Sequence, residues 1–251
     1  MIWSPLEQFE VLSLISINLG LFSNIHISLT NLGLYTIITV FLVLSLHFIG
    51  FNNFQIIPSR WTISLESAFA SVHGLVKAQI GQKNEIYLPF IYSLFFFLLI
   101  SNLNGNIPYG FTITTSLVVS IGLSVAIFLG VTILGLVQNK IHFFSFFLPS
   151  GTPLALVALL VPIEVISYVS RAFSLGIRLF ANITSGHVLI KILSGFLWPI
   201  FTGGLVIGIV TLIPFAIFLG IVGLEIAVSF IQAYVFTILT SRYIKDALEL
   251  H

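Results

Sequence analysis

The sequence predicts an all-α membrane protein with about five membrane-crossing helices and one interfacial amphipathic helix, in which the last two crossings are long, strongly tilted and form a hairpin. Of the 251 residues, 58% are apolar and only 7% are Asp, Glu, Lys or Arg, whereas a soluble domain carries about 25% charged residues. Nine basic and eight acidic side chains cannot cover the surface of a soluble protein this large. A net charge of +1 offers no basic surface to nucleic acid. The absence of cysteine excludes disulfides and thiolate metal sites.

The first part of the chain contains three apolar runs that are long enough to span lipid. They cover residues 29–51, 86–103 and 111–137. The stretch 59–83 mixes charged residues with Trp, Phe and Val, which predicts a helix lying at the membrane interface. Asn, Gly and Pro at 102–108 predict a polar turn. Within the third run, Gly122, Ala126 and Gly130 recur every four residues, and this spacing favours close helix contact in lipid.

The last hundred residues contain two much longer apolar segments, 154–193 and 199–245. As helices they would be roughly 60 and 70 Å long at 1.5 Å per residue, against a hydrocarbon thickness of about 30 Å. Each segment could instead be cut into two upright spans. Charges spread along the first segment disfavour that cut, so we expect two strongly tilted helices with a hairpin around 193–199. The whole chain is then a single membrane domain, 1–251.

Basic residues are concentrated on one side of this arrangement. The side shared by 52–85, 138–153 and the C-terminus carries Arg60, Lys77, Lys83, Lys140, Arg242 and Lys245. The positive-inside rule therefore places the C-terminus inside and the N-terminus outside. Residues 1–11 hold two glutamates and no basic residue, which disfavours a signal or transit peptide and favours insertion from within an organelle or a bacterial membrane protein.

Ionisable groups inside a membrane are expensive and usually functional. At 100° per residue, a stripe about 40° wide on the first long helix contains Glu164, Arg171, Arg178 and Asn182. His187 lies off that stripe. Arg171 is readily explained as a structural partner, but Arg178 has no acid three or four residues away and needs an anionic partner from elsewhere.

The second long helix has two different faces. One face is small, with Ala216, Gly220, Gly223 and Ala227, and the opposite face is polar, with Glu225, Ser229 and Gln232. Histidine exchanges protons near neutral pH and arginine stays charged. Together with buried carboxylates and amides, these residues indicate a proton path.

Two segments resemble a known family. Residues 174–190, SLGIRLFANITSGHVLI, and 225–240, EIAVSFIQAYVFTILT, resemble subunit a of F-type ATP synthases, and residues 4–11 and 243–251 resemble its fungal mitochondrial members. By this resemblance Arg178 is the essential arginine facing the rotor ring. The resemblance matches Asn182 and Gln232 to neighbouring amides, His187 and Glu225 to the outer half-channel, and Glu164 and Asp246 to the inner one. Glu and His are exchanged relative to bacterial members.

The resemblance implies a multi-pass protein of the mitochondrial inner membrane, with its N-terminus in the intermembrane space and its C-terminus in the matrix. Its implied partners are a rotor ring of small hairpin c subunits, peripheral-stalk and other membrane-sector subunits, the lipid bilayer and protons. No cofactor or metal is implied. The chain would be a proton channel of the complex and no enzyme on its own, since it has no phosphate-binding Gly-rich loop followed by Lys. The alternative is a proton-coupled secondary transporter or an antiporter-like respiratory subunit. Such proteins usually contain internal repeats, and none is visible here.

Overall fold

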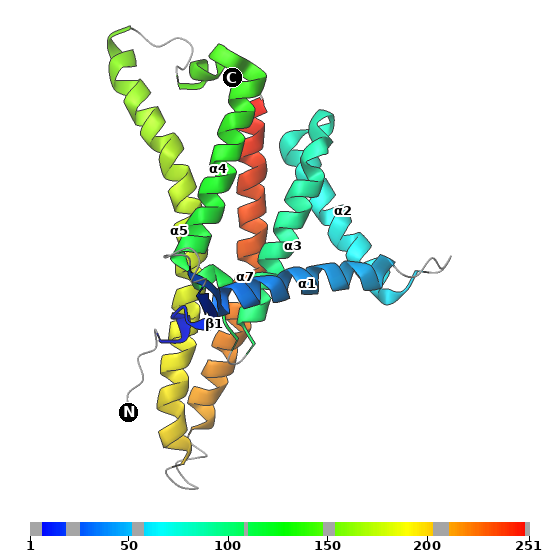
Figure 1. Ribbon diagram of the computed structural model, residues 1–251, viewed down its shortest axis with the longest axis vertical. Helices are drawn as coiled ribbons and strands as arrows, with labels where there is room; N and C mark the ends of the chain where they lie inside the picture. The colour runs from blue at the N-terminus through cyan, green and yellow to red at the C-terminus, as the bar shows by residue number, and fades with distance from the viewer. Residues whose placement is uncertain are drawn as a thin grey trace. The chain divides into compact units, whose positions relative to one another are not determined.

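The structure is a computed structural model that describes residues 7–18, 26–51, 58–107, 110–147, 154–202 and 211–248. In this part of the chain, five helices are long and apolar enough to cross a membrane (Figure 1). The prediction of an all-α membrane protein is confirmed. The α-helices are α1 (Asn31–Phe51), α2 (Arg60–Ile80), α3 (Leu88–Gly105), α4 (Leu117–Asn139), α5 (Leu154–Phe201) and α7 (Leu212–Leu248). Short 3-10 helices are η1 (Glu7–Phe9), η2 (Gln82–Tyr87), η3 (Ile113–Thr115) and η4 (Lys140–Phe147).

Helix α2 occupies the stretch 59–83 for which an amphipathic helix was expected. Its N-cap is Ser59, whose hydroxyl accepts a hydrogen bond from the backbone N–H of Thr62 (3.3 Å). The helix ends at Gly81, which takes φ +83°, a conformation that favours glycine. Its buried side chains, four residues apart, are Val72, Val76 and Ile80. This narrow apolar stripe is the pattern of an amphipathic helix, and its place at the membrane interface stays a prediction.

An N-terminal hairpin was not predicted from the sequence. Strand β1 (Ser13–Asn18) pairs antiparallel with β2 (His26–Thr30), with Ser16 opposite Ser28. Asn31 joins the hairpin to α1, because its side chain donates to the Glu10 carbonyl (3.0 Å) and accepts from the Leu12 N–H (3.3 Å). The strands mix polar residues with Leu and Ile over only five or six residues, which is too short a pattern to stand out beside the long apolar helices.

The turn of the expected hairpin does not lie at 193–199, because α5 continues for 48 residues through Pro199 to Phe201. Proline this close to a helix end removes a single backbone hydrogen bond, and membrane helices tolerate Gly and Pro. The second helix, expected over 199–245, is α7 from Leu212, and residues 203–210 lie outside the described part. At 1.5 Å per residue α5 is about 72 Å long. Its strong tilt stays a prediction.

The third span also begins later than expected. Helix α4 starts at Leu117 instead of 111, and residues 111–115 instead form a buried segment that ends in η3. This segment is rich in threonine, whose hydroxyl competes for backbone groups. Thr115 Oγ1 donates to the Thr112 carbonyl at 2.6 Å, which turns the chain before α4 begins.

The chain divides into two compact units, and α5 and α7 contribute to both. The first unit comprises the described parts of Met1–Phe48, Phe97–Ser116 and Phe180–Ala233. The second unit comprises those of Ile49–Phe96, Leu117–Leu179 and Tyr234–His251.

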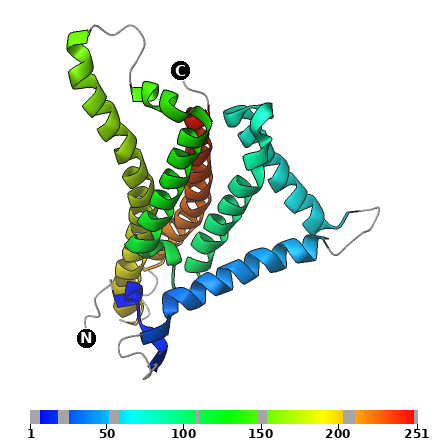
Figure 2. The same cartoon turned by 45° about the horizontal axis from the view of Figure 1, so that its top comes forward.

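In the second unit, α4 lies against α5 around residues 168–176 and against the last part of α7 (Figure 2). The backbones of α5 and α4 come close at Gly176 of α5, where a Cβ would lie 2.9 Å from the Ser120 carbonyl oxygen. Gly122 and Gly130 make no close contact within the described part of the chain, since none of its other elements lies within 4 Å of a Cβ at either. Ser120 and Ser124 of α4 face Gly176 of α5 instead. Serine is small, and the Ser124 hydroxyl donates to the Ile121 carbonyl of its own helix (3.0 Å), so it needs no partner on α5.

Candidate functional site

The first unit brings a histidine of α5 against a glutamate of α7. Nδ1 of His187 lies 3.1 Å from Oε1 of Glu225, and their side chains are only 14% and 6% exposed. The approach depends on the residue before the histidine, because a Cβ at Gly186 would lie 3.0 Å from the same oxygen. Two titratable groups in contact at a buried position can pass a proton between them.

Two amide side chains form a second link between α5 and α7. Asn182 Nδ2 donates to Gln232 Oε1 at 2.9 Å. Gln232 is buried, whereas Asn182 is exposed. Asn182 precedes His187 on α5 and Gln232 follows Glu225 on α7, so the two contacts join the antiparallel helices in matching order.

The end of α3 adds polar groups that sequence reasoning treated only as a turn. Asn106 Nδ2 donates to Ser229 Oγ (3.0 Å), and Ser229 Oγ donates to the Glu225 carbonyl (3.0 Å). Asn102 donates to the Ser229 carbonyl (3.4 Å) and accepts from Thr114 Oγ1 (2.9 Å). The signal was present in the sequence, because amides recur at alternate positions from 102 to 106 at the end of an apolar helix.

Several buried polar atoms around this network have no hydrogen-bond partner among the described residues. All belong to the first unit: Ser101 Oγ, Asn104 Nδ2, Asn106 Oδ1, Thr184 Oγ1, Glu225 Oε1 and Gln232 Nε2. Glu225 Oε1 belongs to this group although it lies 3.1 Å from Nδ1 of His187. Each unpaired buried group costs about 1–3 kcal/mol. A cluster of them is the environment in which proteins hold ordered water.

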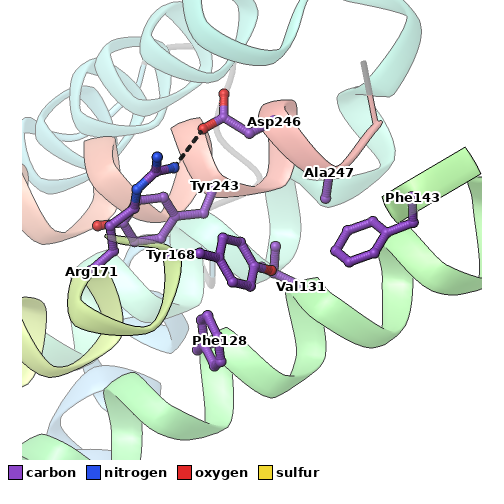
Figure 3. A pocket seen from close by; sticks show the side chains of 8 residues that line it. All are labelled: Phe128, Val131, Phe143, Tyr168, Arg171, Tyr243, Asp246 and Ala247. Carbon is purple, nitrogen blue, oxygen red and sulfur yellow. Dashed lines mark ion pairs between the residues drawn. The ribbon is translucent and has the colours of Figure 1, made fainter. Parts of the chain in front are cut away.

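The second unit brings together the two remaining acidic candidates through an arginine. Arg171 Nη2 lies 3.5 Å from Glu164 Oε1, and Arg171 Nη1 lies 3.5 Å from Asp246 Oδ2. Figure 3 shows the guanidinium of Arg171 directed toward Asp246. All three side chains are about one-third exposed. The sequence explains Arg171 as a structural partner, but it does not predict that the arginine lies between both carboxylates. That position depends on how α7 packs against α5.

A cavity of about 20 Å³ adjoins Arg171 and Asp246 (Figure 3). That volume is enough for roughly one water molecule. The Tyr168 hydroxyl, at its aromatic wall, lies 2.9 Å from Thr132 Oγ1. The other lining residues are Phe128, Val131, Phe143, Tyr243 and Ala247. Across the described residues, no group of three or more His, Asp or Glu is placed to hold a metal ion.

Arg178 differs from Arg171 in its surroundings. Its side chain is exposed, and no acidic group within the described ranges forms an ion pair with it. Its neighbours Phe173 and Ile177 are 46% and 48% exposed. A permanent cation among exposed apolar side chains on a membrane helix is costly, so its position calls for a functional explanation.

The chain resembles one family over nearly all of its length. The sequence profile of the family described as ATP synthase A chain matches residues 33–245. A protein named ATP synthase subunit a from Mycosarcoma maydis is 71% identical over 251 residues, which cover 100% of this chain and 99% of that protein. Proteins of the same name from Emericella nidulans (50% identical, 100% and 98% covered) and Chondrus crispus (44% identical, 100% and 98% covered) are also similar. The chain belongs to the ATP synthase A chain family.

Proposed function

We propose that the His187–Glu225 pair and the Glu164–Arg171–Asp246 cluster belong to two separate proton half-channels. Family membership makes the chain the proton-translocating stator subunit of an F-type ATP synthase. It is a channel component of that complex and not its catalytic subunit. It is a multi-pass protein of the mitochondrial inner membrane. The proposal concerns how its side chains conduct protons.

The observation that carries the proposal is the buried contact between His187 and Glu225, which lies among buried polar atoms without a hydrogen-bond partner in the described residues. Water held by those atoms would link the pair to the outer side of the membrane. A proton arriving at His187 passes to Glu225 and from there to a carboxylate on an adjacent ring of c subunits. The amides of Asn182 and Gln232 offer donors and acceptors along the way without taking a charge.

Protonation neutralises the ring carboxylate, which can then enter the lipid, where a carboxylate ion is strongly disfavoured. After nearly a full turn the ring site meets Arg178. Its guanidinium stays charged and presents several donors, so it favours the ionised carboxylate without carrying protons itself. The released proton leaves by Glu164 and Asp246. Each elementary charge that crosses supplies about 2.3 kcal/mol per 100 mV.

Replacement of Glu225 by Gln tests this role. Gln keeps the shape of the side chain and cannot carry the proton, so Glu225→Gln should reduce proton-driven ATP synthesis severalfold in membranes that contain normal amounts of the assembled complex. A residual rate is expected because water and His187 still relay protons. Glu66→Gln on α2 is the matched control and should leave synthesis unchanged. A full synthesis rate in Glu225→Gln would contradict the proposal.

Sidedness is tested with cysteines, since the native chain has none. A single cysteine at position 187 should react with a membrane-impermeant thiol reagent from the outer side. A single cysteine at 164 should react from the inner side. Labelling of position 164 only from the outer side would overturn the assignment of both half-channels.

A further inference from the structure

His187 has a second close partner, on the segment between α3 and α4. Thr112 Oγ1 lies 3.0 Å from Nε2 of His187, while Nδ1 of the same ring faces Glu225. Both nitrogens of the imidazole therefore have a defined neighbour. Thr112 is 2% exposed, so its hydroxyl has little access to bulk water.

The Thr112 hydroxyl does not cap the short helix that follows it. Thr112 is the N-cap of η3, where a threonine hydroxyl ordinarily accepts a bond from a backbone N–H of the first turn. No such side-chain bond forms here. The turn is held by Thr115 instead, whose Oγ1 donates to the Thr112 carbonyl at 2.6 Å. The Thr112 hydroxyl is thus left available for His187.

Neighbouring residues hold Thr112 in place. A Cβ at Gly105, the last residue of α3, would collide with the Thr112 side chain, including its Oγ1. Only glycine lets the threonine approach this closely.

The imidazole of His187 has a third neighbour. The Phe9 ring of η1 lies against it, with ring centroids 6.2 Å apart and a tilt of 57°. The histidine is therefore in contact with groups on three sides.

We propose that Thr112 is a positioning residue that keeps Nδ1 of His187 directed at Glu225 in both protonation states of the ring. This inference rests on the proposed proton-relay role of the pair. In the neutral ring with Nδ1–H toward Glu225, Nε2 is an acceptor and the threonine hydroxyl donates to it. When the ring is protonated, Nε2–H donates and the same hydroxyl accepts. A hydroxyl can fill both roles, and a methyl group of the same size can fill neither.

Thr112→Val and Thr112→Ser separate the hydroxyl from the shape of the side chain. Thr112→Val should lower proton-driven ATP synthesis and ATP-driven proton pumping about tenfold, the usual effect of depriving a buried group of its partner. Thr112→Ser should restore most of the rate. The control is Thr39→Val, because Thr39 is also buried and its hydroxyl bonds only within α1 (2.8 Å to the Thr36 carbonyl). Rates are compared per assembled complex.

A wild-type rate in Thr112→Val, or a rate in Thr112→Ser as low as in Thr112→Val, would overturn the inference. Should Thr112→Val fail to assemble, Gly105→Ala moves the threonine without removing it and should give the same loss. A wild-type rate in that assembled variant would also overturn it. Parallel measurements of Glu225→Gln keep the two claims apart. If Glu225→Gln is impaired and the Thr112 variants are not, the positioning role alone fails, whereas full activity in Glu225→Gln removes the proton relay itself.

Discussion

A single added methyl group at Gly186 should impair proton transfer between His187 and Glu225. A Cβ at this position would lie 3.0 Å from Glu225 Oε1, 3.3 Å from Cδ and 3.4 Å from Cγ. Ordinary contacts begin at about 3.4 Å, so in Gly186→Ala the carboxylate must move by about 0.4 Å. The added methyl group meets the side chain of Glu225, which is part of the proposed relay and is not a flexible surface side chain.

The size of the effect follows from that displacement. A misplacement of about 1 Å costs roughly 10²-fold in a reaction that depends on alignment. A shift of about 0.4 Å should therefore slow proton-driven ATP synthesis about five- to tenfold, which corresponds to about 1 kcal/mol. Helix propensity works in the opposite direction, because Gly to Ala inside a helix stabilises by about 1 kcal/mol. The variant should thus assemble normally and conduct poorly.

The assay is proton-driven ATP synthesis in membranes, normalised to assembled complex, with ATP-driven proton pumping measured on the same samples. Gly130→Ala on α4 is the control, because no described atom lies within 4 Å of a Cβ there. It should conduct like the wild type. An unchanged rate in Gly186→Ala, or an equal loss in Gly130→Ala, would refute the reasoning from local geometry.

Two further predictions concern the arginines. Arg178→Lys should abolish ATP synthesis although it conserves formal charge, because an ammonium that is removed from water can lose its proton and lacks the planar set of donors. Substantial synthesis by this variant would show that charge alone suffices. Arg171→Gln should slow synthesis, because it leaves Glu164 and Asp246 without the cation that lies 3.5 Å from each. The loss should be smaller than in Arg178→Lys. Arg171→Lys restores a cation and should recover part of the synthesis rate. A rate no higher than that of Arg171→Gln would contradict an electrostatic role. Both are measured as initial rates of ATP synthesis against a fixed proton gradient.

Local properties of the chain predicted the spans and most of the candidate residues. Hydropathy over about twenty residues identifies a membrane helix without reference to its neighbours, which is why α1, α3 and α4 were found. A charge within such a segment stands out for the same reason, so Glu225 and Arg178 are recognisable from the sequence alone.

Helix ends and helix contacts were less predictable. The sequence around Pro199 predicts a break, but α5 continues through this proline. Membrane helices tolerate proline because neighbouring helices, side chains or ordered water satisfy the freed backbone groups. Gly122 and Gly130 have the spacing of a contact surface, yet α5 approaches α4 through Gly176 and the serines beside it. Several faces of an apolar helix carry side chains small enough for close contact, and the packing of the neighbouring helix decides which face is used.

The sequence by itself determined which side chains are too polar for lipid and on which helices they lie, because both properties depend on residues near one another in the chain. The tertiary structure decided which of them meet. Arg171 joins Glu164 to an aspartate on α7, and Thr112 meets a histidine 75 positions further along the chain. Such contacts depend on how helices pack and turns close, and those distances are set by the fold as a whole.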